Sequence, residues 1–230
     1  STSASRWQGC TLATTPSEFT FRTLEPEFSV KVGGRNVVFA CTSGPPNVSD
    51  TVSGRRPGTM DDFRNFVRLS QAFDVVHSSG GAVEPQDVPV HLRHYEMMRS
   101  QLVLSNKVPF LFARGSAQIA DGLELLRIAH GIDADEFRRE PRVWTVINTN
   151  SPLQLDIPMA EGIIDFAEAG QVLIIRPFTL AGVMAPVTVA GALTLAHAEA
   201  LAGITLAQHG WQAVGVDFVG EGLGLVAAVH

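Results

Sequence analysis

Polar side chains crowd the stretch INTNSPLQLD, which runs from Ile147 to Asp156 directly after the apolar run RVWTVI. Asn148, Asn150 and Ser151 offer neutral hydrogen-bonding groups that can bind a carboxylate or an amide of a ligand. The ordinary alternative is turn chemistry, because Asn, Ser and Pro also end strands. The choice between the two depends on what the rest of the chain places beside these residues.

Charged residues at other strand ends form a second group of candidates. Arg114 and Arg176 follow apolar runs, and a guanidinium there can hold a carboxylate of a substrate. An ordinary ion pair is the alternative for both arginines. Glu84, in the loop VEPQDVP, either orients that loop or is a solvated charge. His77 is a weak candidate for moving a proton or for contacting a cofactor, and a structural histidine is the equal alternative.

Three aromatic residues lie on or beside predicted strands: Phe112, Trp144 and Phe178. An aromatic face attracts a quaternary ammonium group by about 0.5–2 kcal/mol, so each ring is a candidate for binding such a cation. Core packing is the alternative for each. Phe178, at a strand end, is the best of the three. Phe112 and Arg114 have the same parity along their strand, so one face can carry both.

Composition limits the other classes of function. Cys10 and Cys41 are the two cysteines, too few for a disulfide framework, and Cys41 has no Cys or His cluster beside it that would make a zinc site. No metal site is therefore predicted. The net charge of −6 argues against nucleic acid as a partner. The apolar stretch 183–206 is interrupted by polar residues, so no membrane span is expected, and a reduced, cytoplasmic setting is the default.

Short apolar runs alternate with helical patterns along the middle of the chain. Thr59 and Ser116 are predicted helix caps, and Gly131 is a predicted helix end. Strand–helix units repeated in this way predict a parallel sheet covered by helices, which is an α/β fold. The predicted strands cover 36–40, 74–81, 108–115, 142–150 and 171–178, and the predicted helices cover 59–73, 88–105, 116–131, 157–170 and 187–210.

Two folds use this pattern, the doubly wound sheet and the (β/α)8 TIM barrel. We favour the barrel, because the strands end in polar or glycine loops and no dinucleotide fingerprint follows a strand. A barrel needs eight units, so the prediction is a TIM-type barrel truncated after about five βα units. Residues 1–36 are expected to be an N-terminal arm or the remnant of a helical region. Residues 37–210 form the partial barrel, and 211–230 form an atypical tail that could hold a sixth strand.

Four blocks of the chain stand out, in this order: GGRNVVFA with the GPP that follows, HSSGGAVEPQDVPV, VINTNSPLQLD, and IIRPFTLAGVMAPVTVAGALTLAHAEALAGI. Together they resemble consecutive blocks of the trimethylamine methyltransferase family. The resemblance runs from about Val32 to Gln208, and the tail departs from it. It implies a (β/α)8 barrel preceded by a helical N-terminal region, in a protein roughly twice this length.

The family resemblance also implies a function. Members move a methyl group from trimethylamine, another methylamine or a glycine-betaine-like quaternary amine to the Co(I) of a corrinoid carried by a partner protein. The implied partners are that corrinoid protein and a small methylated amine, and a homo-oligomer stays open. In archaeal trimethylamine enzymes the residue that reacts with the amine is a pyrrolysine of the later half, so the resemblance assigns no catalytic residue here.

Two alternatives to this function stay open. One is a catalytically silent, truncated fragment that serves as an interaction module. The other is a different TIM-barrel enzyme, such as a lyase.

Overall fold

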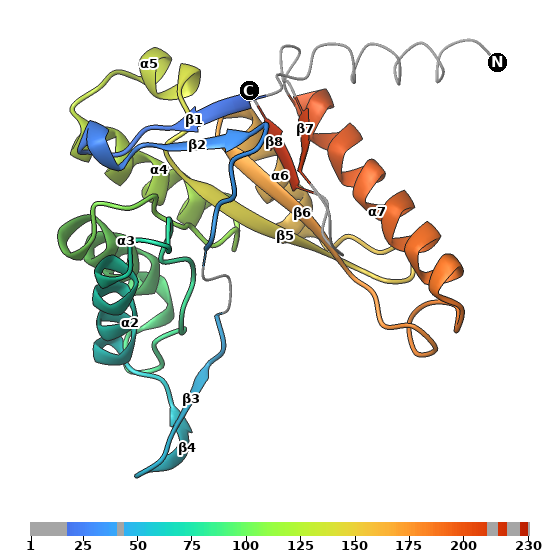
Figure 1. Cartoon of the computed structure of the whole chain (residues 1–230), viewed down its shortest axis with the longest axis horizontal. Coiled ribbons are helices and arrows are strands. Elements are labelled where there is room, and N and C mark those ends of the chain that lie inside the picture. The colour runs from blue at the N-terminus through green and yellow to red at the C-terminus, as the bar shows by residue number, and fades with distance from the viewer. Residues whose placement is uncertain (1–17, 41–43, 211–215, 220–225, 230) are drawn as a thin grey trace.

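The computed structural model describes residues 18–40, 44–210, 216–219 and 226–229, with side chains described up to residue 208 (Figure 1). Residues 1–17 of the predicted N-terminal arm and Cys41, which was considered as a zinc ligand, therefore lie outside the described residues. Parallel segments form the centre of the fold, helices lie against them, and two hairpins lie at their ends.

Five segments of the chain lie parallel to one another in chain order. Ala40 pairs with Ser78, and Ser78 pairs with Val108. Phe110 pairs with Trp144, the first residue of β5 (Trp144–Asn150), and β5 pairs along its whole length with β6 (Val172–Phe178). Each segment thus lies beside the one that precedes it in the sequence, without a reversal of order.

The first three segments are less regular than the sequence predicts. The strands predicted at 36–40, 74–81 and 108–115 are reduced to isolated bridges, and side chains make bonds that a regular ladder would make. Ser78 Oγ donates to the carbonyl of Val108 at 2.6 Å and accepts from Trp144 Nε1 at 2.8 Å. The amide of Gln101 bonds both the N–H and the C=O of Phe110, at 2.8 and 2.9 Å.

The predicted helices are confirmed to within a few residues. Thr59 caps α2 in a box closed by Asp62, as its position predicted. Gly131 ends α4 with a φ of 65°, but the predicted cap at Ser116 is wrong, because Ser116 is the first helical residue and Gly115 precedes it without a side-chain bond. The short α5 was not predicted. The helices are α2 (Met60–Ala72), α3 (Val90–Leu104), α4 (Ser116–His130), α5 (Ala134–Arg139), α6 (Ile157–Glu168) and α7 (Val189–Gly210).

Helices α3 to α7 cover one face of the parallel segments. Ile147 of β5 and Ile175 of β6 are fully buried in a cluster with side chains from these five helices. Gly203 allows α7 to approach closely, since a Cβ there would lie 3.0 Å from Ile175. By length and apolar composition α7 could also cross a membrane, but a core helix of a globular protein passes the same test, so this is weak evidence.

Helices α2 and α3 each bury only a narrow apolar face. On α2, Phe63 and Val67 are buried, whereas Phe66 and Leu69 are exposed. On α3, Met98 is buried and Leu102 is partly buried, whereas Leu92 and Tyr95 are exposed. The two helices pack mainly on each other at one end of the helical layer, so fewer of their side chains have a partner.

A hairpin covers the amino ends of the parallel segments. It consists of β1 (Glu18–Phe21) and β2 (Val30–Gly33), joined through the short turn η1 (Pro26–Phe28). Both strands lie in the region expected to be an N-terminal arm or the remnant of a helical region, and the two phenylalanines of β1 point toward the core. The hairpin packs Phe19, Phe21, Val30 and Val32 against Val108, Phe110, Trp144 and Val172.

A second hairpin follows the first parallel segment. It consists of β3 (Asn47–Asp50) and β4 (Gly54–Pro57), and it projects away from the body at the opposite end from β1 and β2 (Figure 1). The sequence predicted a loop in this region. The hairpin forms instead because of its turn: Asp50 Oδ1 accepts from the N–H groups of Val52 and Ser53, and Gly54 takes a φ of 67°.

The C-terminal tail contains two strands in its described part. β7 (Val216–Val219) and β8 (Val226–Val229) pair antiparallel, and β8 also pairs antiparallel with β6 through Leu173 and Ala227. The tail was expected to hold a sixth strand, and these two strands extend the β5–β6 sheet in antiparallel order. The TIM-type barrel truncated after about five βα units stays a prediction.

His130, the last residue of α4, lies beside the buried Arg142. Arg142 Nη1 lies 2.9 Å from His130 Nδ1, and because a guanidinium can only donate, Nδ1 must be unprotonated. Burial lowers the pKa of His130 from 6.5 to about 4, and the charge of Arg142 contributes to this shift. The native state therefore keeps this imidazole neutral at a pH where an unfolded chain would protonate it.

We expect the free energy of unfolding to decrease as the pH falls from about 6.5 to about 4, because the unfolded state then binds a proton that the native state refuses. A His130→Leu variant should lack this part of the acid loss, measured by urea denaturation at several pH values. His91→Leu, at an exposed site of α3, should keep it. Equal pH slopes for His130→Leu and the unchanged chain would contradict the prediction.

Candidate functional site

The carboxyl ends of the parallel segments bring several predicted residues together. Sites in parallel β/α folds lie at this edge, because the loops that leave the strands converge there. In Figure 1 this is the side of the molecule from which β3 and β4 project, and β5 and β6 run toward it. Most of the candidates in the sequence lie on loops or strand ends at this edge.

Glu84 is the centre of a charged cluster at this edge. Its Oε1 accepts from Arg93 Nη1 at 2.7 Å and also pairs with Arg114 Nη1. The guanidinium of Arg114 lies 4.5 Å from the ring centroid of Phe112, so the expectation that these two residues share a face is confirmed. Glu84 and Arg93 are mostly buried, whereas the side chain of Arg114 is 40% exposed.

The cluster has one carboxylate for two guanidinium groups. Burial alone would raise the pKa of Glu84, but the hydrogen bonds from Arg114 and Arg93 outweigh it and hold the pKa below its ordinary value. Glu84 is therefore ionised at neutral pH and offsets one of the two positive charges. The cluster keeps one positive charge in excess, and Arg114 is the more exposed of its two arginines.

Close backbone approach joins this cluster to the loop after the first segment. A Cβ at Gly44 would lie 2.4 Å from Cζ of Phe112, so only glycine fits against that ring. The N–H of Glu84 donates to the carbonyl of Pro45 at 3.0 Å. The loops that carry Gly44, Glu84 and Arg114 thus meet around Phe112, and the contacts between them hold all three in place.

The exposed face of β5 and β6 carries the second group of candidates. Asn148 lies in register with Arg176, and Asn150 lies in register with Phe178. All four side chains are exposed, while the neighbouring Thr149 points to the helical side and is buried. This face therefore presents a guanidinium, two amides and an aromatic ring that is 53% exposed.

The guanidinium of Arg176 makes no hydrogen bond or ion pair with any residue that the structure describes. Such a guanidinium can take a carboxylate, and the neighbouring amides can donate to or accept from a polar ligand. Among the three aromatic candidates, Trp144 is buried and packs against Phe110 at 4.9 Å, and Phe112 lies under Arg114. Phe178 is the ring that remains open to a cation.

Ser151 points away from this exposed face. Its hydroxyl donates to Glu199 Oε2 at 3.0 Å and lies 2.6 Å from the hydroxyl of Thr179. Glu199 of α7 also accepts from Thr149 Oγ1 and from the N–H of Leu153, both at 2.8 Å. It is only 3% exposed, so one buried carboxylate holds the loop that follows β5.

Glu199 is the residue that the sequence analysis missed. In the sequence Glu199 is only one of the polar residues that interrupt the apolar stretch 183–206. An acidic residue among Ala and Leu in a core helix does signal a buried partner, because an unpaired charge there would be costly. The partners lie about fifty residues earlier in the chain, so the signal names the residue but not its contacts.

His77 lies apart from the other candidates. Its Nδ1 accepts from the N–H of Phe39 at 3.1 Å. The ring lines an apolar cavity of about 250 Å³ together with Phe19, Trp144 and Val172, toward the β1–β2 hairpin. Among the described residues, no group of three His, Cys, Asp or Glu side chains is arranged to hold a metal ion.

Comparison with known proteins gives consistent matches. The family described as Trimethylamine methyltransferase (MTTB) matches residues 5–214. A protein named glycine betaine methyltransferase, from Desulfitobacterium hafniense, is 38% identical over 86% of this chain and 41% of its own length. A trimethylamine methyltransferase from the same species is 26% identical over 84% of the chain and 39% of its own length.

A trimethylamine methyltransferase from Methanosarcina mazei is 34% identical over 37% of the chain and 17% of its own length. The chain therefore spans about two fifths of the length of the Desulfitobacterium relatives that it matches.

We expect Glu199→Ala to lower the free energy of unfolding by about 2–4 kcal/mol, because two hydroxyls and one N–H lose a charged acceptor in a buried place. Glu199→Gln should cost less, since one amide oxygen still accepts. Urea denaturation measures both, with Glu161→Ala on the exposed side of α6 as the control. Hydrogen exchange at the Leu153 amide should accelerate in Glu199→Ala, and a variant as stable as the control would contradict this role.

Proposed function

Because this chain belongs to the trimethylamine methyltransferase family, we propose that it is part of an enzyme that transfers a methyl group from a methylated amine to the Co(I) of a corrinoid protein. The observation that carries the proposal is the family match over residues 5–214, together with 38% identity to a protein named glycine betaine methyltransferase. Since the chain spans about two fifths of that relative, the activity is proposed for a protein that includes this chain.

The chemistry sets three tasks for the protein. The corrinoid of the partner supplies the nucleophile for displacement at the methyl carbon, and the amine leaves with the C–N electron pair. The chain must therefore hold the donor, keep water away from it and align its methyl group. A quaternary ammonium needs no proton to become a good leaving group, so the site needs a cation-binding surface more than a catalytic acid.

The exposed face of β5 and β6 offers the groups for these tasks. Phe178 presents an aromatic ring, which attracts a methylated ammonium by about 0.5–2 kcal/mol. Arg176 lies two residues before Phe178 on the same face of β6, and Asn148 lies beside it in register on β5. There the two side chains can bind a carboxylate of the donor or an amide of the corrinoid periphery. Asn150, beside Phe178, adds a second amide at the same edge.

We also propose that the parallel segments are an arc of a (β/α)8 barrel. Two features support this fold over the doubly wound sheet. The segments follow one another in chain order, whereas a doubly wound sheet reverses its order at a switch point. Helices α3 to α7 lie on one face of the array, as they do around a barrel. In such an arc Arg176 and Phe178 would face the interior.

The family membership favours this reaction over the alternative of a lyase on the same fold. The alternative of a catalytically silent interaction module makes a different prediction, since it would bind without turnover. Activity of the extended protein therefore separates the two.

The test combines the chain, extended to the length of its relatives, with a reduced corrinoid protein and a panel of donors that includes trimethylamine and glycine betaine. We expect the absorption of a methyl–cobalt species to appear with at least one donor. No such spectrum with any donor would contradict the proposed reaction.

We expect Phe178→Ala to raise the KM for a quaternary donor by up to about tenfold, because the ring face contributes part of the binding of the cation. Phe178→Tyr keeps the ring and should restore most of the affinity. Phe73→Ala removes a similarly exposed ring at the end of α2 and serves as the control. A KM that is unchanged in Phe178→Ala would exclude this ring from the site.

A further inference from the structure

The β3–β4 hairpin carries exposed side chains that the methyl-transfer site does not use. Val52 at the turn is 94% exposed, an unusual position for an aliphatic residue on a projecting arm. Arg55 on β4 is exposed, and its guanidinium makes no hydrogen bond or ion pair with any described residue. The tip of the hairpin projects away from the body at the carboxyl side of the array (Figure 1).

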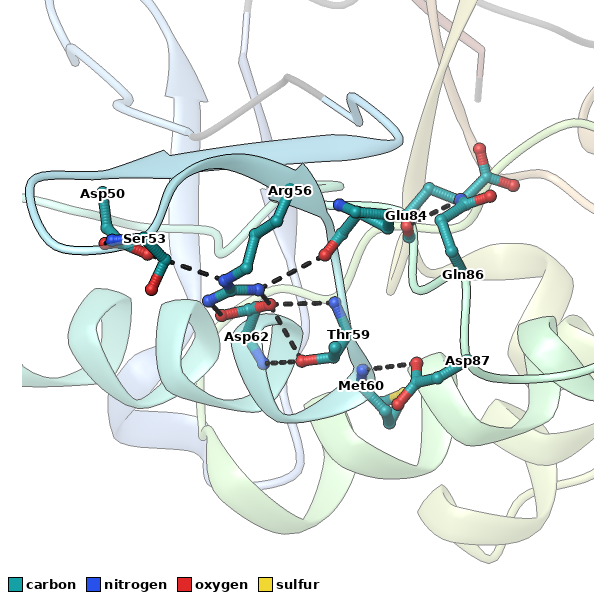
Figure 2. Close-up of polar contacts among 10 residues, drawn as sticks. Asp50, Ser53, Arg56, Thr59, Met60, Asp62, Glu84, Gln86 and Asp87 are labelled. Atoms are coloured by element: carbon teal, nitrogen blue, oxygen red, sulfur yellow. Dashed lines mark hydrogen bonds and ion pairs between the residues drawn. The ribbon is translucent and has the colours of Figure 1, made fainter.

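Polar contacts hold this hairpin in place although few apolar residues cover it. Arg56 makes a fork to Asp62 of α2, with Nη1 and Nη2 at 2.6 and 2.8 Å from the two carboxylate oxygens. The same carboxylate accepts from the N–H of Thr59 at 2.9 Å, so the fork is tied to the helix cap (Figure 2). The fork from Arg56 holds the pKa of Asp62 well below its ordinary value.

The order of the hairpin requires such an anchor. A two-stranded hairpin is marginally stable on its own, and a free arm with these exposed residues would sample many conformations. The Asp50 turn and the Arg56–Asp62 fork instead present Val52 and Arg55 in one arrangement. A rigid arm loses less entropy when it binds a partner than a flexible one does.

The base of the hairpin is bonded to the loop that carries Glu84. The N–H of Gly58 donates to the carbonyl of Pro46 at 2.9 Å, and the N–H of Gln86 donates to the carbonyl of Gly58 at 2.8 Å. Asp87 of the same loop accepts from the N–H of Met60 at 2.8 Å (Figure 2). The β3–β4 hairpin and the Glu84–Arg114 cluster are therefore both held by the loop that carries Glu84.

We propose that the tip of the β3–β4 hairpin is a docking element for the corrinoid-carrying protein, with Val52 against an apolar patch and Arg55 against a carboxylate of that partner. This inference rests on the proposed function. A methyl acceptor carried by another protein has to be presented at the carboxyl edge, and the hairpin extends outward from that edge. The chain has a net charge of −6, so an exposed cation on the arm gives an acidic patch a specific place to bind.

The test measures the Kd between the chain and a corrinoid-binding protein from the same genome, loaded with hydroxocobalamin, by biolayer interferometry. We expect Val52→Asp and Arg55→Glu each to raise the Kd about tenfold, as truncation of central interface residues does. Val103→Asp, at a 72% exposed site on α3, should leave the Kd unchanged. Circular dichroism melting of each variant checks that the hairpin substitutions leave the fold intact.

Four results would overturn the docking role. The first is an unchanged Kd in both hairpin variants, and the second is equal weakening by Val103→Asp. The third is an absence of measurable binding by the unchanged chain. If the hairpin variants instead alter the sedimentation of the chain alone, the arm is an interface between copies of this chain, and the proposal is also overturned. The proposed reaction is tested separately by methyl–cobalt formation, so either idea can fail while the other stands.

Discussion

The buried backbone groups of the parallel segments need hydrogen-bond partners, and this requirement shapes the whole structure. An unpaired N–H or C=O in a core costs about 1–3 kcal/mol, so irregular segments are stable only where other groups supply the bonds. Gln101 does so for Phe110, and Ser78 links Val108 with Trp144. Gln171, which is fully buried, accepts from the N–H of Arg142 and donates to the carbonyl of Phe137.

The division of the array into two ends follows from what covers each of them. At the amino ends, the aromatic residues of β1 pack against Phe110 and Trp144 and form an apolar layer. At the carboxyl ends the side chains are charged or amide-bearing, and they are held by partners such as Glu84. The structure thus separates the end that stabilises the fold from the end that can meet a ligand.

The sequence predicted the order of strands and helices because that order depends on local periodicity. It also predicted the cap at Thr59, which depends on residues three positions apart. It did not predict the β1–β2 hairpin or the β3–β4 hairpin, and it did not predict the loss of regular strands at 74–81 and 108–115. The β3–β4 hairpin depends on the turn at Asp50 and on the Arg56–Asp62 fork, which hydrophobic periodicity does not reveal. The loss of regular strands depends on contacts between distant residues, such as Ser78 with Val108 and Trp144, which no local pattern contains. The candidate site was predicted in its residue types, but the pairing of Glu84 with two arginines and the inward turn of Ser151 required coordinates.

The carboxylate of Glu199 has a consequence for how this family can vary. It serves donors at Thr149, Ser151 and Leu153, and two of those three bonds come from side chains that a single substitution can remove. Positions 149, 151 and 199 are therefore expected to change together among relatives, as a correlated set. A chimera that takes α7 from one relative and the segment after β5 from another would separate this set unless all three positions were transplanted at once.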